Sequence, residues 1–326
     1  MDRTERRECK RAAAEALASA TYCPKKLVLI HTAVSSGLAL LVALVTFLLD
    51  QQIAGTTGLS GMGSQAILES AQQILQLAMM LVLPFWSVGL LQCFLRIHRR
   101  EAAEPKTLLT GFQWFGPVLR TLLLQALVLC GAAFLGGYVG MFLYTMTPLY
   151  RQFYEAVAPY MVDGVVDFNA ILADKACIDA MLWPILFTLL GAFVAVIPVY
   201  YRLRVANYIL LDHPEKGALF ALRASKTLMR GKRFDLFKLD LSFWWFYGLE
   251  ALVTVICYGD VALNAFGVDL GLSQTVLFFG FYVLALVLQL GLYVWKQPLL
   301  QATYAGYYDA LLPQTQPDAT QEGPVF

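Results

Sequence analysis

The chain has 326 residues, of which 59% are hydrophobic and 14% are charged, with a formal net charge of +1 at pH 7. Soluble domains average about 45–50% apolar and about 25% charged residues, so this composition excludes a soluble fold without large exposed apolar patches. The cations lie in stripes beside apolar segments, a pattern that suits anionic lipid headgroups and not nucleic acid.

Six long apolar segments predict six membrane-spanning helices, each with about the 20 residues that a bilayer crossing requires. The predicted spans are residues 27–49, 74–95, 118–146, 181–201, 236–257 and 274–295. The first run is too long for a cleavable signal peptide and is interpreted as a retained anchor. We therefore predict an all-α polytopic bundle: a basic amphipathic segment at 1–26, one six-helix membrane domain at 27–312, and a disordered tail at 313–326.

The distribution of Lys and Arg along the chain orients the predicted spans. Seven of the 24 precede the first span and nine fall within residues 202–238, whereas residues 50–73 and 258–273 contain none. The positive-inside rule assigns basic connections to the cytoplasm. We therefore expect the amino terminus, the second and fourth connections and the carboxyl terminus to be cytoplasmic.

Basic segments before the first, third and fifth spans predict amphipathic helices that lie in the headgroup plane. The clearest covers residues 219–230, where small residues such as Ala221 lie opposite the cations Arg223, Lys226 and Arg230. We expect these three cations to face anionic headgroups or the acidic residues Asp212 and Asp235. The order of interfacial helix, span, hairpin and span occurs three times, which suggests a three-fold repeat. Chance similarity among apolar segments is the alternative.

Glu250 is the clearest candidate for a functional polar group inside the membrane. It lies about fourteen residues into the fifth predicted span, where an ionised carboxylate requires a partner or water. Gln289 of the sixth span is a second candidate, because its amide can donate hydrogen bonds. Three interpretations stay open: a ligand or coupling site, a hydrogen bond that joins helices through a tyrosine such as Tyr282, or exposure to an external vestibule.

The sequence carries no motif for catalysis, a metal or a cofactor. It contains no His-Glu-x-x-His motif, Cys-x-x-Cys pair, phosphate loop or Gly-x-Ser-x-Gly motif, and its three histidines are far apart. We therefore expect a protein that is not an enzyme, with no catalytic residue, cofactor or metal site. Among the six cysteines, Cys177 and Cys257 share the predicted external side, and whether they pair is left open.

Residues 200–243 carry the most distinctive pattern in the chain. They contain the runs Tyr-Arg-Leu-Arg-Val-Ala-Asn-Tyr-Ile-Leu-Leu-Asp-His-Pro, Ala-Leu-Arg-Ala-Ser-Lys-Thr-Leu-Met-Arg-Gly-Lys-Arg and Leu-Phe-Lys-Leu-Asp-Leu-Ser-Phe. Looser patterns lie on either side of this segment: Pro84, Gly89, Phe94, Arg96, Leu109, Gly111 and Phe112 before it, and Pro298 with Tyr307, Tyr308, Asp309, Ala310 and Leu311 after it.

Together these patterns resemble the bacterial membrane protein family catalogued as domain of unknown function 975, over about residues 5–312. The resemblance implies a six-helix protein of the bacterial inner membrane. The same family is similar to membrane domains attached to some glycerophosphodiester phosphodiesterases. The resemblance implies no assigned activity, so the function has to be argued from the residues.

Two functions from different classes fit the sequence. The first is a module that binds, transports or organises a lipid or another amphiphile, with anionic headgroups at its cytoplasmic face. The second is a structural or regulatory subunit that pairs with another membrane protein. A cavity that holds an amphiphile would favour the first, and a closed bundle with an exposed patch of small residues would favour the second.

Overall fold

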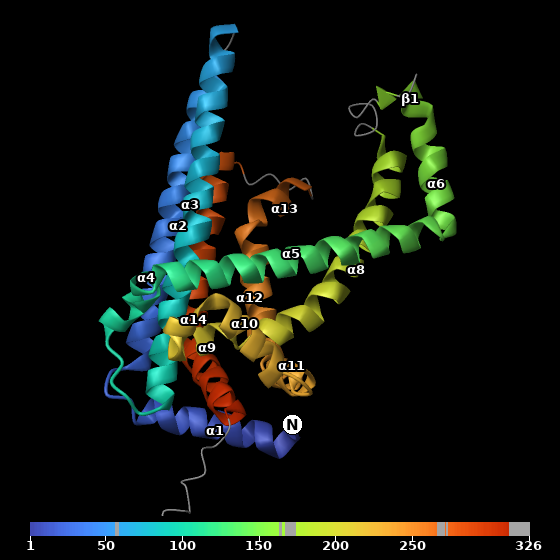
Figure 1. Ribbon diagram of the computed structural model, residues 1–326. Helices are drawn as coiled ribbons and strands as arrows, with labels where there is room; N and C mark the ends of the chain where they lie inside the picture. The colour runs from blue at the N-terminus through green and yellow to red at the C-terminus, as the bar shows by residue number, and fades with distance from the viewer. Residues whose placement is uncertain (56–58, 163–164, 167–173, 266–270, 272, 313–326) are drawn as a thin grey trace, which may run out of the picture. The chain divides into compact units, whose positions relative to one another are not determined.

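The computed structural model describes residues 1–55, 59–162, 165–166, 174–265, 271 and 273–312. These residues are almost all helical, apart from the antiparallel two-residue strands β1 (Met161–Val162) and β2 (Val165–Val166) (Figure 1). The predicted disordered tail at 313–326 lies outside them. The contacts of the chain form two compact units, which are described separately.

Unit 1 comprises Met1–Leu119, Asn207–Glu215 and Phe234–Phe326, and unit 2 comprises Arg120–Ala206 and Lys216–Arg233. The all-helical class is confirmed, whereas the prediction of one six-helix domain stays a prediction.

Five helices are long and apolar enough to cross a membrane, so the chain is a multi-pass membrane protein. They are α2 (Pro24–Gly55), α3 (Leu59–His98), α5 (Phe115–Thr145), α8 (Lys175–Leu203) and α14 (Gln274–Leu311). The fifth predicted span is instead a pair of helices, α11 (Arg233–Leu241) and α12 (Trp244–Cys257), bent by 63°. The sixth crossing, which would be this bent pair, stays a prediction.

The break between α11 and α12 is stabilised by a residue far away in sequence. The ammonium of Lys10 donates to the Ser242 carbonyl oxygen at 3.0 Å and lies 3.8 Å from the ring centroid of Phe243. A carbonyl released from the helical ladder needs such a donor in an apolar environment. Residues 236–257 are mainly apolar in spite of Lys238, Asp240 and Glu250, so hydropathy did not indicate the break.

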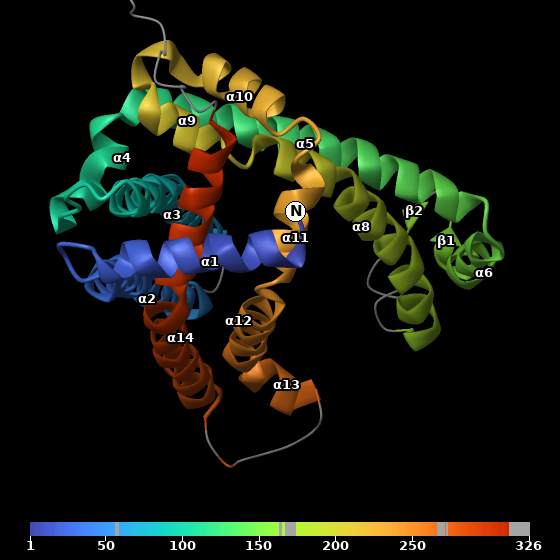
Figure 2. The same ribbon diagram turned by 90° about the horizontal axis from the view of Figure 1, so that it is seen from below.

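In unit 1, α2, α3 and α14 run side by side and α1 (Arg3–Ala18) crosses the end of α14 (Figures 1 and 2). The amino terminus of α1 is closed by a capping box of Asp2 and Glu5. Its buried face meets a core that joins α2, α3 and α14, with fully buried members such as Ala13, Leu27 and Ala302. The amphipathic character predicted for residues 1–26 therefore serves packing against this core.

The connection after α3 is a 3₁₀ helix, η1 (Pro105–Leu109), followed by the short helix α4 (Thr110–Gln113). Its backbone comes so close to α3 that two glycines are required. A Cβ atom on Gly89 would lie 1.8 Å from the Leu108 carbonyl oxygen, and one on Gly111 would lie 2.0 Å from that of Phe85. We call this contact the α3 seam. It explains why both glycines stand in the motif.

In unit 2, α5 crosses α8 through three glycines. A Cβ atom on Gly140 would lie 2.1 Å from the Phe187 carbonyl oxygen, and Gly136 and Gly191 approach each other's backbone as closely. Small residues of this kind allow close helix crossing in membranes. The rest of unit 2 includes α6 (Pro148–Val157) and the 3₁₀ turn η2 (Ala158–Tyr160).

The predicted amphipathic helix at 219–230 is α10 (Gly217–Leu228) of unit 2. Its buried residues are Ala218, Ala221 and Ser225, and the Ser225 hydroxyl donates to the Arg202 carbonyl oxygen of α8 at 2.8 Å. The small apolar face therefore packs on α8. Three short helices complete the chain: α9 (Ala206–Asp212), η3 (Pro214–Lys216) and α13 (Gly259–Ala265).

Candidate functional site

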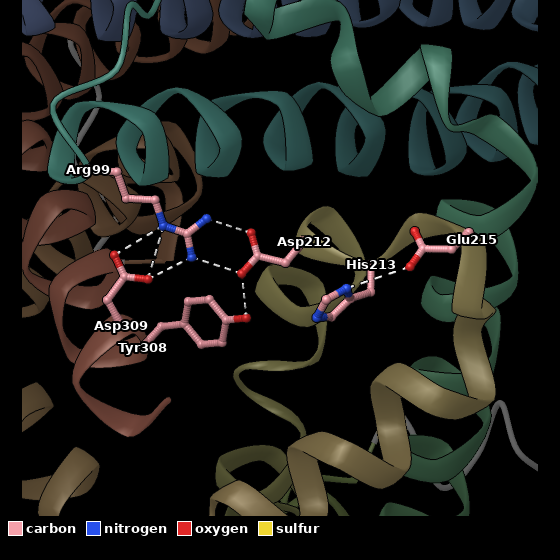
Figure 3. Close-up of polar contacts among 6 residues, drawn as sticks. All are labelled: Arg99, Asp212, His213, Glu215, Tyr308 and Asp309. Atoms are coloured by element: carbon pink, nitrogen blue, oxygen red, sulfur yellow. Dashed lines mark hydrogen bonds and ion pairs between the residues drawn. The ribbon is translucent and has the colours of Figure 1, made fainter. Parts of the chain in front are cut away.

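Two segments of the sequence motif meet at the carboxyl ends of α3, α9 and α14 in unit 1 (Figure 3). Arg99 donates to both carboxylate oxygens of Asp212, at 2.6 and 2.8 Å, and to Asp309 at 2.7 Å. The Tyr308 hydroxyl donates to Asp212 at 2.8 Å. We call these four residues the Arg99 clasp.

The Arg99 clasp is a charged junction with one cation for two carboxylates. The pKa of Arg99 is raised well above its usual range, first by its hydrogen bonds to Asp212 and then by those to Asp309. The guanidinium is therefore permanently charged and already engaged. An anionic ligand would have to displace a carboxylate to reach it, so the clasp is suited to holding three helix ends together.

Aromatic stacking also stabilises the Arg99 clasp. Tyr308 is buried and its ring stacks on that of Tyr208, with centroids 5.2 Å apart. Beside it, the His98 imidazole packs against Gly306, where a Cβ atom would lie 2.6 Å from the ring. The neighbouring His213 lies 3.6 Å from Glu215. Helix ends α3, α9 and α14 are thus joined by charge and by ring packing.

No individual role was predicted for Arg99. It belongs to the basic run after the second predicted span, which was used only for orientation. Asp212 and Asp309 stood in the motif without an assigned function. A cation and two acids more than 110 residues away can be paired only when the fold is known, because Arg99 and Asp212 are 113 positions apart.

The two candidates inside the membrane, Glu250 and Gln289, converge on one tyrosine. The Tyr293 hydroxyl of α14 donates to the Glu250 carboxylate of α12, and the Gln289 side chain hydrogen-bonds to the same tyrosine. Tyr282, the expected example, instead stacks on Phe278 at 6.0 Å between centroids. The geometry places Glu250 in a contact between helices, which is the second of the three interpretations.

The other predicted candidates are not part of the Arg99 clasp. Arg223, Lys226 and Arg230 are exposed on α10 and just after it. Cys177 and Cys257 are both free thiols. Among the residues that the structure describes, no group of three or more His, Cys, Asp or Glu side chains is placed to hold a metal ion.

A cavity of about 630 Å³ lies in unit 1 between α2, α3, α13 and α14. Its lining residues are Ala39, Val42, Ala43, Thr46, Phe47, Gln76, Met79, Asp260, Thr275 and Phe278. We call it the Asp260 cavity, because it contains one carboxylate that is only 5% exposed. Its volume is within the range of small-molecule sites, about 300–1,000 Å³. The Asp260 cavity could not be predicted from the sequence, because its lining residues come from four separate helices.

The comparison with known families agrees with the motif. The family described as "Protein of unknown function (DUF975)" matches residues 1–315, so the chain belongs to this family. No curated protein and no solved structure matches the chain. The resemblance expected from the sequence is confirmed, and it assigns no activity.

Proposed function

We propose that this family member is a non-enzymatic protein of the bacterial inner membrane that binds an amphiphile, in order to transport or organise it. The Asp260 cavity carries the proposal. Its walls are mainly apolar side chains, with Thr46, Gln76, Thr275 and Asp260 as the polar members. Apolar walls with a few convergent polar groups are the usual features of a ligand site.

The composition of the cavity indicates what kind of amphiphile would fit. Ala39, Ala43 and Phe47 offer surface to a hydrocarbon chain, whereas the Asp260 carboxylate is buried beside them. We therefore infer an amphiphile whose apolar body lies against these side chains and whose polar part lies near Thr46, Gln76, Thr275 and Asp260.

The finer topology belongs to the same proposal. Six crossings, with the bent pair α11–α12 as the fifth, would put both termini in the cytoplasm, as the distribution of cations indicates. The Asp260 cavity would then lie towards the external ends of the spans. α1 and α10 would lie along the cytoplasmic headgroups, with the exposed cations Arg223, Lys226 and Arg230 facing anionic lipid. The three-fold repeat remains a hypothesis.

Filling the cavity tests the proposal directly. In Ala43→Phe the added ring would occupy the space beside Phe47, so the purified variant should lose most of the amphiphile that copurifies with the wild type. Leu44→Phe is the matched control, because Leu44 is on the same helix and does not line the cavity. Lipid mass spectrometry of detergent extracts gives the measurement. Equal amphiphile content in the three proteins would disprove the proposal.

The second candidate function is a structural or regulatory subunit of a membrane complex. A groove of about 460 Å³ in unit 2 favours it, with walls made by α5 and α8. Gly136, Gly140 and Gly191 form its floor, and small residues at a groove let another helix approach closely. A photo-crosslinker at Leu190, which lines the groove, should then capture one defined protein in cells. The same probe at exposed Leu189, outside the groove, should not.

A further inference from the structure

A second pocket of unit 1 is lined mainly by polar side chains, whereas the Asp260 cavity is lined mainly by apolar ones. It has a volume of about 360 Å³ and lies between the last turn of α3 and the connection formed by η1 and α4. Its lining residues are Arg96, Ala102, Glu104, Lys106, Thr107, Thr110 and Gln113. We call it the Arg96 pocket. Six of these seven side chains are polar or charged, so its natural ligand is polar.

The charges of the Arg96 pocket leave an excess of one cation. Arg96 and Lys106 are positive and Glu104 is negative. Within the described part of the chain, the buried Nε atom of Arg96 has no hydrogen-bond partner. A guanidinium N–H group without an acceptor is costly, and an anion in the pocket would supply one.

Arg99, one turn further along the chain, shows by contrast what an occupied guanidinium looks like. Its N–H groups are held by Asp212 and Asp309. Arg96 makes no ion pair with the residues that the structure describes. The two arginines are therefore in opposite states: Arg99 holds the fold together, and Arg96 is available to a ligand.

The threonines of the pocket add neutral donors at fixed positions. The Thr107 hydroxyl oxygen accepts from the Glu104 amide at 3.3 Å, so its own proton is free to donate. The Thr110 hydroxyl donates to the backbone carbonyl oxygen of Thr107 at 2.7 Å, which holds the Thr110 side chain in place. The Gln113 amide supplies further donors. Two cations and several neutral donors around one small space suit an anion with several oxygen atoms.

We propose that the Arg96 pocket binds a phosphate group. Phosphate presents oxygens in several directions, which the planar fork of Arg96, the ammonium of Lys106 and the Thr107 hydroxyl can share. The phosphate can belong to the headgroup of an anionic lipid or to a free phosphorylated molecule, and the pocket chemistry is the same for both. This site is separate from the Asp260 cavity and does not depend on the proposed function.

The test uses the purified full-length protein in detergent, with two probes. Native mass spectrometry measures binding of dioleoylphosphatidylglycerol, with dioleoylglycerol as the same diacylglycerol without the phosphoglycerol headgroup. Isothermal titration calorimetry measures binding of inorganic phosphate. The variants are Arg96→Gln and Lys106→Gln. Lys25→Gln is the control, because it removes one exposed cation that does not line the pocket.

We expect Arg96→Gln to weaken phosphate-dependent binding at least about tenfold and Lys106→Gln about threefold or more, since charge-assisted hydrogen bonds are lost. Lys25→Gln should bind like the wild type. If the two pocket variants weaken binding of dioleoylphosphatidylglycerol and inorganic phosphate does not bind, a lipid headgroup is the source of the phosphate. If they weaken binding of inorganic phosphate, the source is a free phosphorylated molecule.

Equal binding of dioleoylphosphatidylglycerol and dioleoylglycerol together with no binding of inorganic phosphate would overturn the proposal. So would binding that both pocket variants leave unchanged. If Arg96→Gln does not fold, Lys106→Gln decides the matter, because Lys106 is exposed at the mouth of the pocket and its loss leaves the packing intact.

Discussion

The α3 seam of unit 1 and the α5–α8 crossing of unit 2 solve the same packing problem in different surroundings. Both rest on glycines that allow backbone contact. At the seam the neighbouring side chains are buried, with Phe85 2% and Leu108 0% exposed. At the crossing they are open, with Leu135 67% and Val194 62% exposed. The α3 seam is thus stabilised both by backbone contact and by a core of buried side chains. The α5–α8 crossing is stabilised by backbone contact, and its apolar side chains face the surroundings of the protein.

The largest expected effect is at the seam, for Gly89→Ala. The new methyl group would overlap the Leu108 carbonyl oxygen, and the buried neighbours cannot move aside. We therefore expect the free energy of unfolding to fall by about 3 kcal/mol or more. Thermal unfolding in detergent gives the measurement. Gly116→Ala is the control, since a Cβ atom there meets nothing within 4 Å. A wild-type midpoint for Gly89→Ala would mean that η1 can move away from α3.

A smaller effect is expected at the crossing, for Gly140→Ala. The overlap with the Phe187 carbonyl oxygen is similar, but exposed neighbours let α5 and α8 separate, so we expect about 1–2 kcal/mol. Gly131→Ala, in open space on the same helix, should be neutral or slightly stabilising because alanine favours helix. If Gly140→Ala proves as damaging as Gly89→Ala, the contrast between the two units is wrong.

The Arg99 clasp should contribute less than the Gly89 contact and about as much as the Gly140 contact. Arg99→Ala leaves two carboxylates facing each other at a partly exposed site, for which we expect about 1–2 kcal/mol, between exposed and buried ion pairs. Arg99→Lys should lose most of the same stabilisation, because lysine cannot donate to Asp212 and Asp309 in the same fork geometry. Arg100→Ala serves as the control. High salt should reduce the difference between Arg99→Ala and wild type.

The smallest effect is expected for Glu250. If its carboxylate only accepts from Tyr293, Glu250→Gln should be almost silent and Glu250→Leu should cost about 0.6 kcal/mol, the average for hydrogen bonds between membrane helices. Tyr293→Phe should cost at least as much as Glu250→Leu, because it also removes the hydrogen bond with Gln289. A collapse of the thermal midpoint in Glu250→Gln would instead require an ionised carboxylate held by a buried cation.

The parts of the fold that hydropathy encodes were predictable, and those that depend on distant residues were not. α2, α3, α8 and α14 each contain a predicted span and extend beyond it, because helices continue past the apolar stretch that defines a crossing. α5 covers its predicted span except for the last residue, Met146. The bend at Ser242 was not predictable, since Lys10 stabilises it from 232 positions away. Glycine at 89 and 111 was visible as a pattern, but its reason lies in the backbone of another segment.

The sites divide in the same way. Glu250 and Gln289 stood out because polar residues are rare inside apolar spans, and the structure does bring them to one hydroxyl group. Asp260 looked like an ordinary residue of a connection between spans, and Arg96 stood in the sequence pattern without an assigned role. Their interest comes from burial and from the side chains around them, which a single sequence does not contain.

The packing of α1 has a consequence for how the protein is made. The Cys9 thiol lies against the Thr303 carbonyl oxygen, 294 positions later, so the first helix to leave the ribosome docks on the last. At about 5–20 residues per second, α1 waits roughly 15–60 s for its place. During that time its apolar face must be shielded by the membrane surface or by a chaperone. A chain that ends before α14 leaves uncovered the part of this face that docks on α14.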